Sequence, residues 1–191
     1  MRFIIGPRPA RLAIAVVCAV LLGGCGGQAA DSRAAPTASM LPPTTTIPPL
    51  TAEEAAWLDG LPKLAKKLEE KKNKIYKAAT AGLTRPMMVS LAETFGSCSR
   101  ELARLGAPSD RLRPVYALAQ KACQQHSKAA KCQATVAKVS DAGGGVVVGS
   151  PQSRTWERAG RCVEAADKKA TQLLADAQAK GDQIRATVGG G

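Results

Sequence analysis

Residues 123–132 read Cys123-Gln124-Gln125-His126-Ser127-Lys128-Ala129-Ala130-Lys131-Cys132 and place two cysteines on one predicted helix. Their spacing of nine residues covers roughly 13 Å along a helix axis and about two and a half turns, so the two side chains leave opposite faces. The Cα atoms of a disulfide lie only about 4.4–6.8 Å apart. Cys123 and Cys132 therefore cannot bond to each other, and we expect each to bond to a different neighbouring helix.

On both sides of this segment, apolar residues recur every three to four positions, which predicts amphipathic helices. The first opens with the capping box Thr51-Ala52-Glu53-Glu54, and we expect a break in it at Gly60-Leu61-Pro62. The four predicted helices cover about residues 51–81, 84–105, 113–140 and 151–188. Short links between long helices favour an all-α fold, an antiparallel up-down four-helix bundle.

The N-terminus has the pattern of a secretory signal. Residues 1–11 carry arginines and no acidic residue, and residues 12–22 form an apolar run of 11 residues. A membrane-spanning helix needs about 20 apolar residues, so this run is too short to span well. A charged start followed by a short apolar stretch indicates export, and the absence of an Arg-Arg pair indicates the general export pathway.

The residues that follow are Leu22-Gly23-Gly24-Cys25, and they resemble the lipobox of secreted bacterial lipoproteins. The resemblance implies that Leu22, Gly23 and Gly24 are recognised, that Cys25 accepts the lipid, and that residues 1–24 are removed. It places the protein on the extracytoplasmic face of the cell membrane, held by its N-terminal lipid. The leader is rich in Ala, Gly and Arg, which is typical of an actinobacterium. The resemblance ends at Cys25 and brings no activity for the domain that follows.

Residues 25–50 read as a lipidated cysteine followed by a disordered, Pro/Thr-rich stalk. The pairs Pro42-Pro43 and Pro48-Pro49 favour extended polyproline II, and the stretch has too few apolar residues to fold by itself. We therefore expect a folded helical domain over residues 51–188.

The remaining cysteines form an even set once Cys18 is removed with the leader and Cys25 is lipidated. They are Cys98, Cys123, Cys132 and Cys162. An even number of cysteines in an exported chain predicts disulfides. Measured from the predicted helix ends, Cys98 and Cys123 lie at heights that agree within about 5 Å, and Cys132 and Cys162 match in the same way. Pairing Cys98 with Cys132 leaves a mismatch of more than about 10 Å. We predict the disulfides Cys98–Cys123 and Cys132–Cys162.

Basic charge gathers on the first predicted helix. The chain has 27 Lys+Arg and 15 Asp+Glu, and removal of the leader with its three arginines leaves a net charge of +9. Seven lysines of this helix are candidates for binding an anionic surface: Lys63, Lys66, Lys67, Lys71, Lys72, Lys74 and Lys77. Phospholipid head groups or an anionic wall polymer would suit such a surface, whereas the predicted compartment argues against nucleic acid. The other interpretation is an outer helix face that only keeps the domain soluble.

The sequence offers little for catalysis. Its single histidine, His126, falls on the apolar side of the third helix and could act as a general base with Glu101 or Tyr116. There is no nucleophile motif and no Cys-x-x-Cys pair, so we predict no catalytic residue, no metal and no cofactor.

These observations favour a non-catalytic binding or scaffolding module of the cell envelope, not an enzyme. Its expected partners are the membrane, through the N-terminal lipid, and an anionic polymer, phospholipid or envelope protein. Two alternatives remain open: a carrier of a small apolar ligand between helices, and an accessory subunit of an envelope enzyme.

Overall fold

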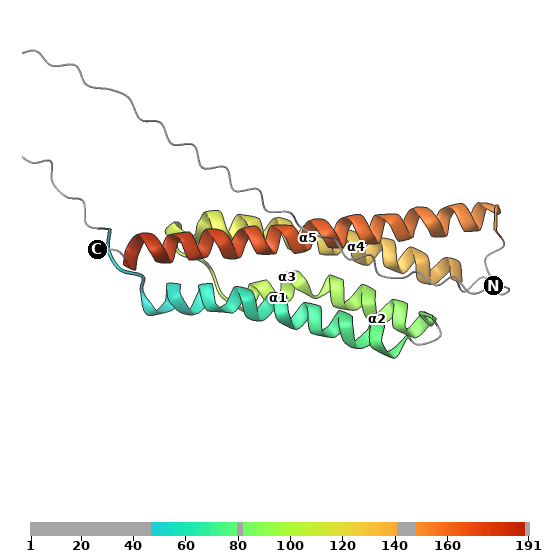
Figure 1. Ribbon diagram of the computed structural model, residues 1–191, viewed down its shortest axis with the longest axis horizontal. Helices are drawn as coiled ribbons and strands as arrows, with labels where there is room; N and C mark the ends of the chain where they lie inside the picture. The colour runs from blue at the N-terminus through green and yellow to red at the C-terminus, as the bar shows by residue number, and fades with distance from the viewer. Residues whose placement is uncertain (1–46, 80–81, 141–147, 190–191) are drawn as a thin grey trace, which may run out of the picture. The chain divides into compact units, whose positions relative to one another are not determined.

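The computed structural model describes residues 47–79, 82–140 and 148–189, and these residues form helices and their connections (Figure 1). The elements are α1 (Ala52–Ala78), α2 (Arg85–Gly96), α3 (Cys98–Ala103), the 3-10 helix η1 (Asp110–Leu112), α4 (Arg113–Ser140) and α5 (Pro151–Gly189). The leader, the lipobox Leu22–Cys25 and the stalk up to residue 46 lie outside the described residues, so the expectations about them stay predictions. Among the helices described, none is both long enough and apolar enough to cross a membrane.

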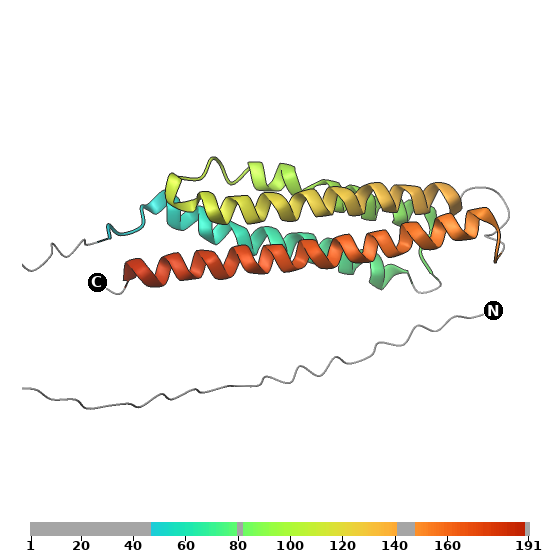
Figure 2. The same ribbon diagram turned by 90° about the horizontal axis from the view of Figure 1, so that it is seen from above.

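The helices pack against one another and bury three apolar clusters among the described residues. α4 and α5 lie side by side over most of their length, as the two views in Figures 1 and 2 agree. α2 and α3 pack against α4, and α1 packs against α2, α3 and α5. The all-helical fold predicted from the apolar repeats is therefore confirmed.

Helix α1 is continuous, and the break expected at Gly60-Leu61-Pro62 is absent. The capping box does form, with Thr51 Oγ1 accepting from Glu54 N at 3.1 Å and Thr51 N donating to Glu54 Oε2 at 3.0 Å. Pro62 is exposed, whereas Gly60 is buried, and a Cβ atom at Gly60 would lie 2.5 Å from Leu105 Cδ2. Gly60 therefore serves close packing against the α3 side, and the contacts of the leucines around it hold the helix together despite the proline.

The second predicted helix is divided in two at Ser97. The Ser97 hydroxyl donates to the Thr94 carbonyl at 2.8 Å, and the Ser97 N–H is shared between the carbonyls of Glu93 and Thr94. A serine side chain that bonds to the backbone in this way competes with the regular helical ladder. The apolar stripe of this segment is buried across the interruption, including Leu91, Phe95 and Leu102.

Both predicted disulfides are present. Cys98 and Cys123 join α3 to α4 with a Cα–Cα distance of 5.2 Å, and Cys132 and Cys162 join α4 to α5 at 6.0 Å. The two bonds leave α4 on different sides, as the spacing of its cysteines requires.

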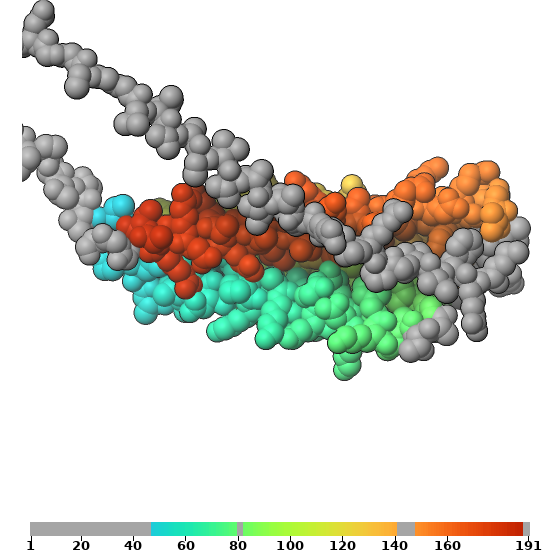
Figure 3. All heavy atoms as spheres, in the orientation of Figure 1, coloured from blue at the N-terminus to red at the C-terminus, as the bar shows by residue number. Residues whose placement is uncertain are grey.

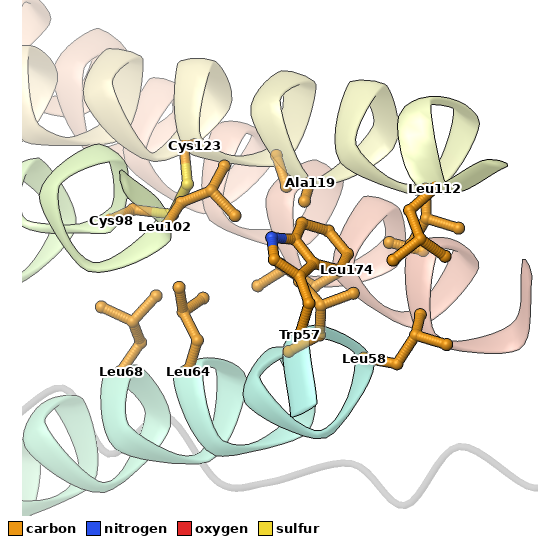
Figure 4. Packing of buried hydrophobic residues seen from close by; sticks show 14 residues of the cluster. Trp57, Leu58, Leu64, Leu68, Cys98, Leu102, Leu112, Ala119, Cys123 and Leu174 are labelled. Carbon is orange, nitrogen blue, oxygen red and sulfur yellow. A yellow bond between two sulfur atoms is a disulfide. The ribbon is translucent and has the colours of Figure 1, made fainter. Parts of the chain in front are cut away.

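The largest apolar cluster surrounds the Cys98–Cys123 bond (Figure 4). Trp57 and a row of leucines on α1 meet Leu102 of α3, Ala119 of α4 and Leu174 of α5, all at most 6% exposed. The Trp57 indole donates to the Gly106 carbonyl at 3.2 Å, so its polar atom is satisfied. Fully buried alanines let the helices approach closely; they are Ala119, Ala122, Ala129, Ala170 and Ala177.

Removing the bond between α4 and α5 should destabilise the domain. In the parent protein this disulfide joins residues with a sequence separation of 30 and so restricts the conformations of the unfolded chain. The double variant Cys132→Ala with Cys162→Ala removes that restriction. We expect the free energy of unfolding to fall by about 3 kcal/mol in urea titrations. Unchanged stability, or four free thiols in the mass spectrum of the parent domain, would contradict the prediction.

Candidate functional site

A groove runs along the seam between α1 and α5 and has a volume of about 490 Å³. Its walls are mostly apolar: Pro62, Ala65 and Leu68 come from α1, and Leu174 and Ala175 come from α5. Figure 3 shows α1 and α5 as adjacent ridges on one face of the domain. This groove is the main candidate site for a ligand, because its volume falls within the roughly 300–1,000 Å³ of small-molecule pockets.

One end of the groove is closed by a buried ion pair between Lys72 and Asp167. Lys72 Nζ lies 2.9 Å from Asp167 Oδ2 and 2.9 Å from Glu69 Oε2, and Lys72 is only 6% exposed. Burial by itself would lower the pKa of Lys72, but hydrogen bonds to Asp167 and Glu69 together with their charges outweigh it and raise that pKa. Its inclusion in an anion-binding surface was therefore wrong, because Lys72 points into the domain and is neutralised there.

His126 lies beside this ion pair and also lines the groove. It is 3% exposed, its ring stacks on Phe95 with centroids 5.7 Å apart, and its Nδ1 lies 3.7 Å from Asp167 Oδ1 without a hydrogen-bond partner. Burial lowers the pKa of His126, while the Asp167 carboxylate opposes that shift and the Lys72 charge adds to it. His126 is therefore held in its neutral form inside the domain at neutral pH.

The pairing of His126 with Glu101 or Tyr116 considered from the sequence does not occur. Glu101 instead accepts from Lys67 at 2.7 Å and from Arg104 at 2.9 Å. Tyr116 packs against Trp57, with ring centroids 6.2 Å apart. Across the described residues, no three His, Cys, Asp or Glu side chains are grouped so that they could hold a metal ion.

A second ion pair joins α1 to α5 beyond the groove, where it lines a smaller pocket of about 120 Å³. Arg185 Nη2 donates to Asp59 Oδ1 at 2.6 Å and to the Ala55 carbonyl at 3.4 Å, which joins α5 to the first part of α1. Beside it, a Cβ atom at Gly181 would lie 2.8 Å from Leu58 Cδ2, so the two helices touch closely here. The two ion pairs thus connect α1 to α5 at two places, and the groove lies along α1 from Pro62 to Lys72.

The exposed side of α1 carries the lysine face, which we define as Lys63, Lys66, Lys67, Lys71, Lys74 and Lys77. At about 100° per residue, these six positions fall within an arc of roughly 140°, opposite the buried leucines. Two of them make exposed ion pairs: Lys67 with Glu101 at 2.7 Å and Lys66 with Glu70 at 3.8 Å. The structure therefore groups six of the seven predicted lysines and removes Lys72 from the set.

A further cavity of about 420 Å³ lies near the start of α1. The polar groups in it bond to one another and connect α1 to the segment before α4. Its Glu54 carboxylate accepts from the Ser109 hydroxyl at 2.6 Å, and this bond, together with the Thr51 N–H and Arg111, lowers the pKa of Glu54. Arg111 also donates to the Pro48 carbonyl at 3.0 Å. Residues assigned to the end of the stalk are thus attached to the domain.

The two ion pairs between α1 and α5 were not predicted from the sequence, although the position of Lys72 gave a signal for one of them. Lys72 lies four residues after Leu68 and three before Ile75, which places it on the buried stripe of α1. A lysine at such a position requires a carboxylate from a neighbouring helix. No pattern in the sequence identifies Asp167 as that partner, because α5 carries several acidic residues with similar spacing to its apolar stripe.

Removing the buried cation tests the Lys72–Asp167 pair. Lys72→Met leaves Asp167, whose side chain is 26% exposed, without its partner. We expect the free energy of unfolding to fall by about 2 kcal/mol, less than for a fully buried pair because water still reaches Asp167. The matched control Lys71→Met changes an exposed neighbour and should shift stability by no more than about 0.5 kcal/mol. Equal effects of the two substitutions in urea unfolding would contradict this role.

The buried histidine predicts a pH dependence of stability. An unfolded chain takes up a proton at His126 near its ordinary pKa of 6.5, whereas the folded chain does so only at lower pH. The unfolded state therefore binds more protons as the pH falls through 6.5, and the free energy of unfolding decreases between about pH 7.5 and 5.5. His126→Gln should flatten this decrease, as measured by urea unfolding at both pH values. The same slope in both proteins would show that His126 titrates freely when folded.

The chain was compared with protein-family models, curated proteins and solved structures, and it matches none of them.

Proposed function

We propose that this protein is a membrane-anchored lipoprotein on the extracytoplasmic face of the cell, where it acts as a non-catalytic binding module. In this proposal Cys25 carries the lipid, residues 26–46 form the tether, and the lysine face of α1 contacts an anionic surface of the envelope. The observation that carries the proposal is the set of six exposed lysines on one side of a single helix.

The arrangement of α1 supports this role. Its opposite side is held in the core by Leu61, Leu64 and Leu68, each at most 4% exposed, so the lysines are presented on a fixed helix. A lysine close to an anionic membrane contributes about 1 kcal/mol, and six on one side can act together. α1 is also the first helix after the tether, and the 21 residues of the tether at about 3 Å each reach roughly 60 Å.

The proposal includes the antiparallel up-down four-helix bundle. The covalent links between consecutive elements, Cys98–Cys123 and Cys132–Cys162, support this course of the chain. A non-enzymatic role is supported by the surroundings of His126, which is 3% exposed and whose neighbours Phe95, Lys72 and Asp167 include no nucleophile.

The carrier alternative is favoured by one specific observation, the groove of about 490 Å³ between α1 and α5. Binding at the lysine face and binding in the groove are compatible, since both lie along α1 and share Lys66 at the rim.

Vesicle binding tests the lysine face. The secreted chain with Cys25→Ser lacks the predicted lipid, so any association with phosphatidylglycerol vesicles must come from the domain. Changing four lysines of the lysine face to glutamine, at positions 63, 71, 74 and 77, should weaken association at least about tenfold at low salt. Sedimentation with vesicles of graded composition measures the effect.

The matched control removes the same charge elsewhere: Lys121, Lys131, Lys168 and Lys169, all exposed on α4 and α5, are changed to glutamine. This variant should retain most of the binding. Equal losses in the two variants would assign the binding to net charge alone. No preference for phosphatidylglycerol over phosphatidylcholine would remove the proposed anionic-surface contact with the membrane.

A further inference from the structure

The groove has the length of a single lipid chain. Its α1 wall runs from Pro62 to Lys72, and these ten steps along the helix cover roughly 15 Å. One acyl chain spans about half of a hydrocarbon core that is about 30 Å thick, or roughly 15 Å. An extended chain therefore fits along the groove.

The walls suit an apolar chain and not a polar one. Pro62, Ala65 and Leu68 face Leu174 and Ala175 across the groove, and small side chains at its centre leave it open. The charged Lys72 in the wall is already neutralised by carboxylates at 2.9 Å, so it does not need a partner from the ligand. Thr171 and Gln178 of α5 also line the groove, and a hydrocarbon chain would gain apolar contact with the five apolar residues beside them.

The charges around the groove indicate where a head group would lie. The Lys72 end holds two carboxylates for one ammonium, and the Arg185 end places Asp59 and Asp182 beside one guanidinium. Both ends therefore repel an anionic group. The open side is different, because Lys66 lies at the rim with its side chain 77% exposed and only a 3.8 Å ion pair to Glu70. An anionic head is complementary to this side.

We propose that the α1–α5 groove binds the acyl chain of a free single-chain amphiphile with an anionic head, such as a long-chain fatty acid, and that Lys66 contacts the head. The proposal goes beyond the contact of the lysine face with a surface. The proposal rests on the groove, so a negative result in the vesicle experiment does not contradict it. A negative result with the acyl probe likewise leaves the lysine face as a surface contact.

The test uses a fluorescent acyl probe, dansyl-undecanoic acid, and the secreted chain with Cys25→Ser. Ala175 is exposed and lines the groove, so Ala175→Trp should fill the groove without disturbing the core and weaken probe binding about tenfold or more. The matched control is Ala165→Trp, at an exposed position of α5 outside the groove, which should leave binding unchanged. Circular dichroism melting verifies that both variants fold.

Two comparisons define the ligand. Palmitate should displace the probe and butyrate should not, because only the longer chain fills the groove. Lys66→Glu should weaken binding of the acid probe and leave its methyl ester unaffected, since only the acid has an anionic head. The chain proposal is overturned if Ala175→Trp and Ala165→Trp bind the probe equally. The head-group assignment is overturned if Lys66→Glu affects acid and ester alike.

A last arm separates a free amphiphile from the protein's own lipid. The lipidated wild-type chain and the Cys25→Ser chain are compared in the same vesicles, with Ala175→Trp in each background to subtract probe dissolved in the bilayer. Equal groove-dependent signals support a free ligand. Loss of that signal only in the lipidated chain would overturn the proposed source and assign the groove to the lipid on Cys25.

Discussion

The position of α4 is fixed by covalent bonds to the helices on either side of it. Cys123 and Cys132 leave α4 on opposite faces, so one disulfide holds α3 and the other holds α5. Because the domain has few aromatic residues, the burial of large side chains adds little to its stability. The disulfides compensate by restricting the conformations of the unfolded chain. The small alanines between α4 and α5 then allow close packing, because the disulfide already sets the register of the two helices.

Helix α1 has no such bond, and this difference explains where the domain is open. α1 is held by its apolar stripe, by Gly60 against Leu105, and by the ion pairs that Lys72 and Asp59 make with α5. Of the two ion pairs, only the one made by Lys72 is buried, whereas the side chains of Arg185 and Asp59 are 40% and 55% exposed. The seam between α1 and α5 is open at the groove, where the small side chains of Ala65 and Ala175 lie.

Regular patterns made much of the fold predictable. The spacing of Cys123 and Cys132 on one helix excluded one of the three pairings, and the heights of the cysteines measured from the helix ends excluded a second, since the rise per residue of a helix is nearly constant. The starts of α4 and α5 followed from Pro114 and Pro151, because proline is favoured in the first turn of a helix. The interruption at Ser97 was not predictable, because a serine bonds to its own backbone or to water according to what surrounds it.

The candidate site was harder to predict because it depends on contacts between helices distant in sequence. The pattern of α1 showed where its lysines lie around the helix, but it did not show that Lys72 meets Asp167, 95 residues later. His126 was correctly placed on the apolar side of its helix, yet its neighbours Phe95 and Asp167 come from two other helices. Local periodicity gives the direction of a side chain, and only tertiary packing gives its partner.

The burial of Lys72 has a consequence for the exposed side of the same helix. Its ion pair with Asp167 and the buried leucines of α1 hold the rotation of the helix about its axis. That rotation turns the lysine face to the outside and leaves Lys66 at the rim of the groove. The orientation of the lysine face therefore depends on the contacts that hold α1 in the core. Any ligand in the groove would lie beside Lys66, so it would contact both a lysine of the lysine face and the apolar residues of α1.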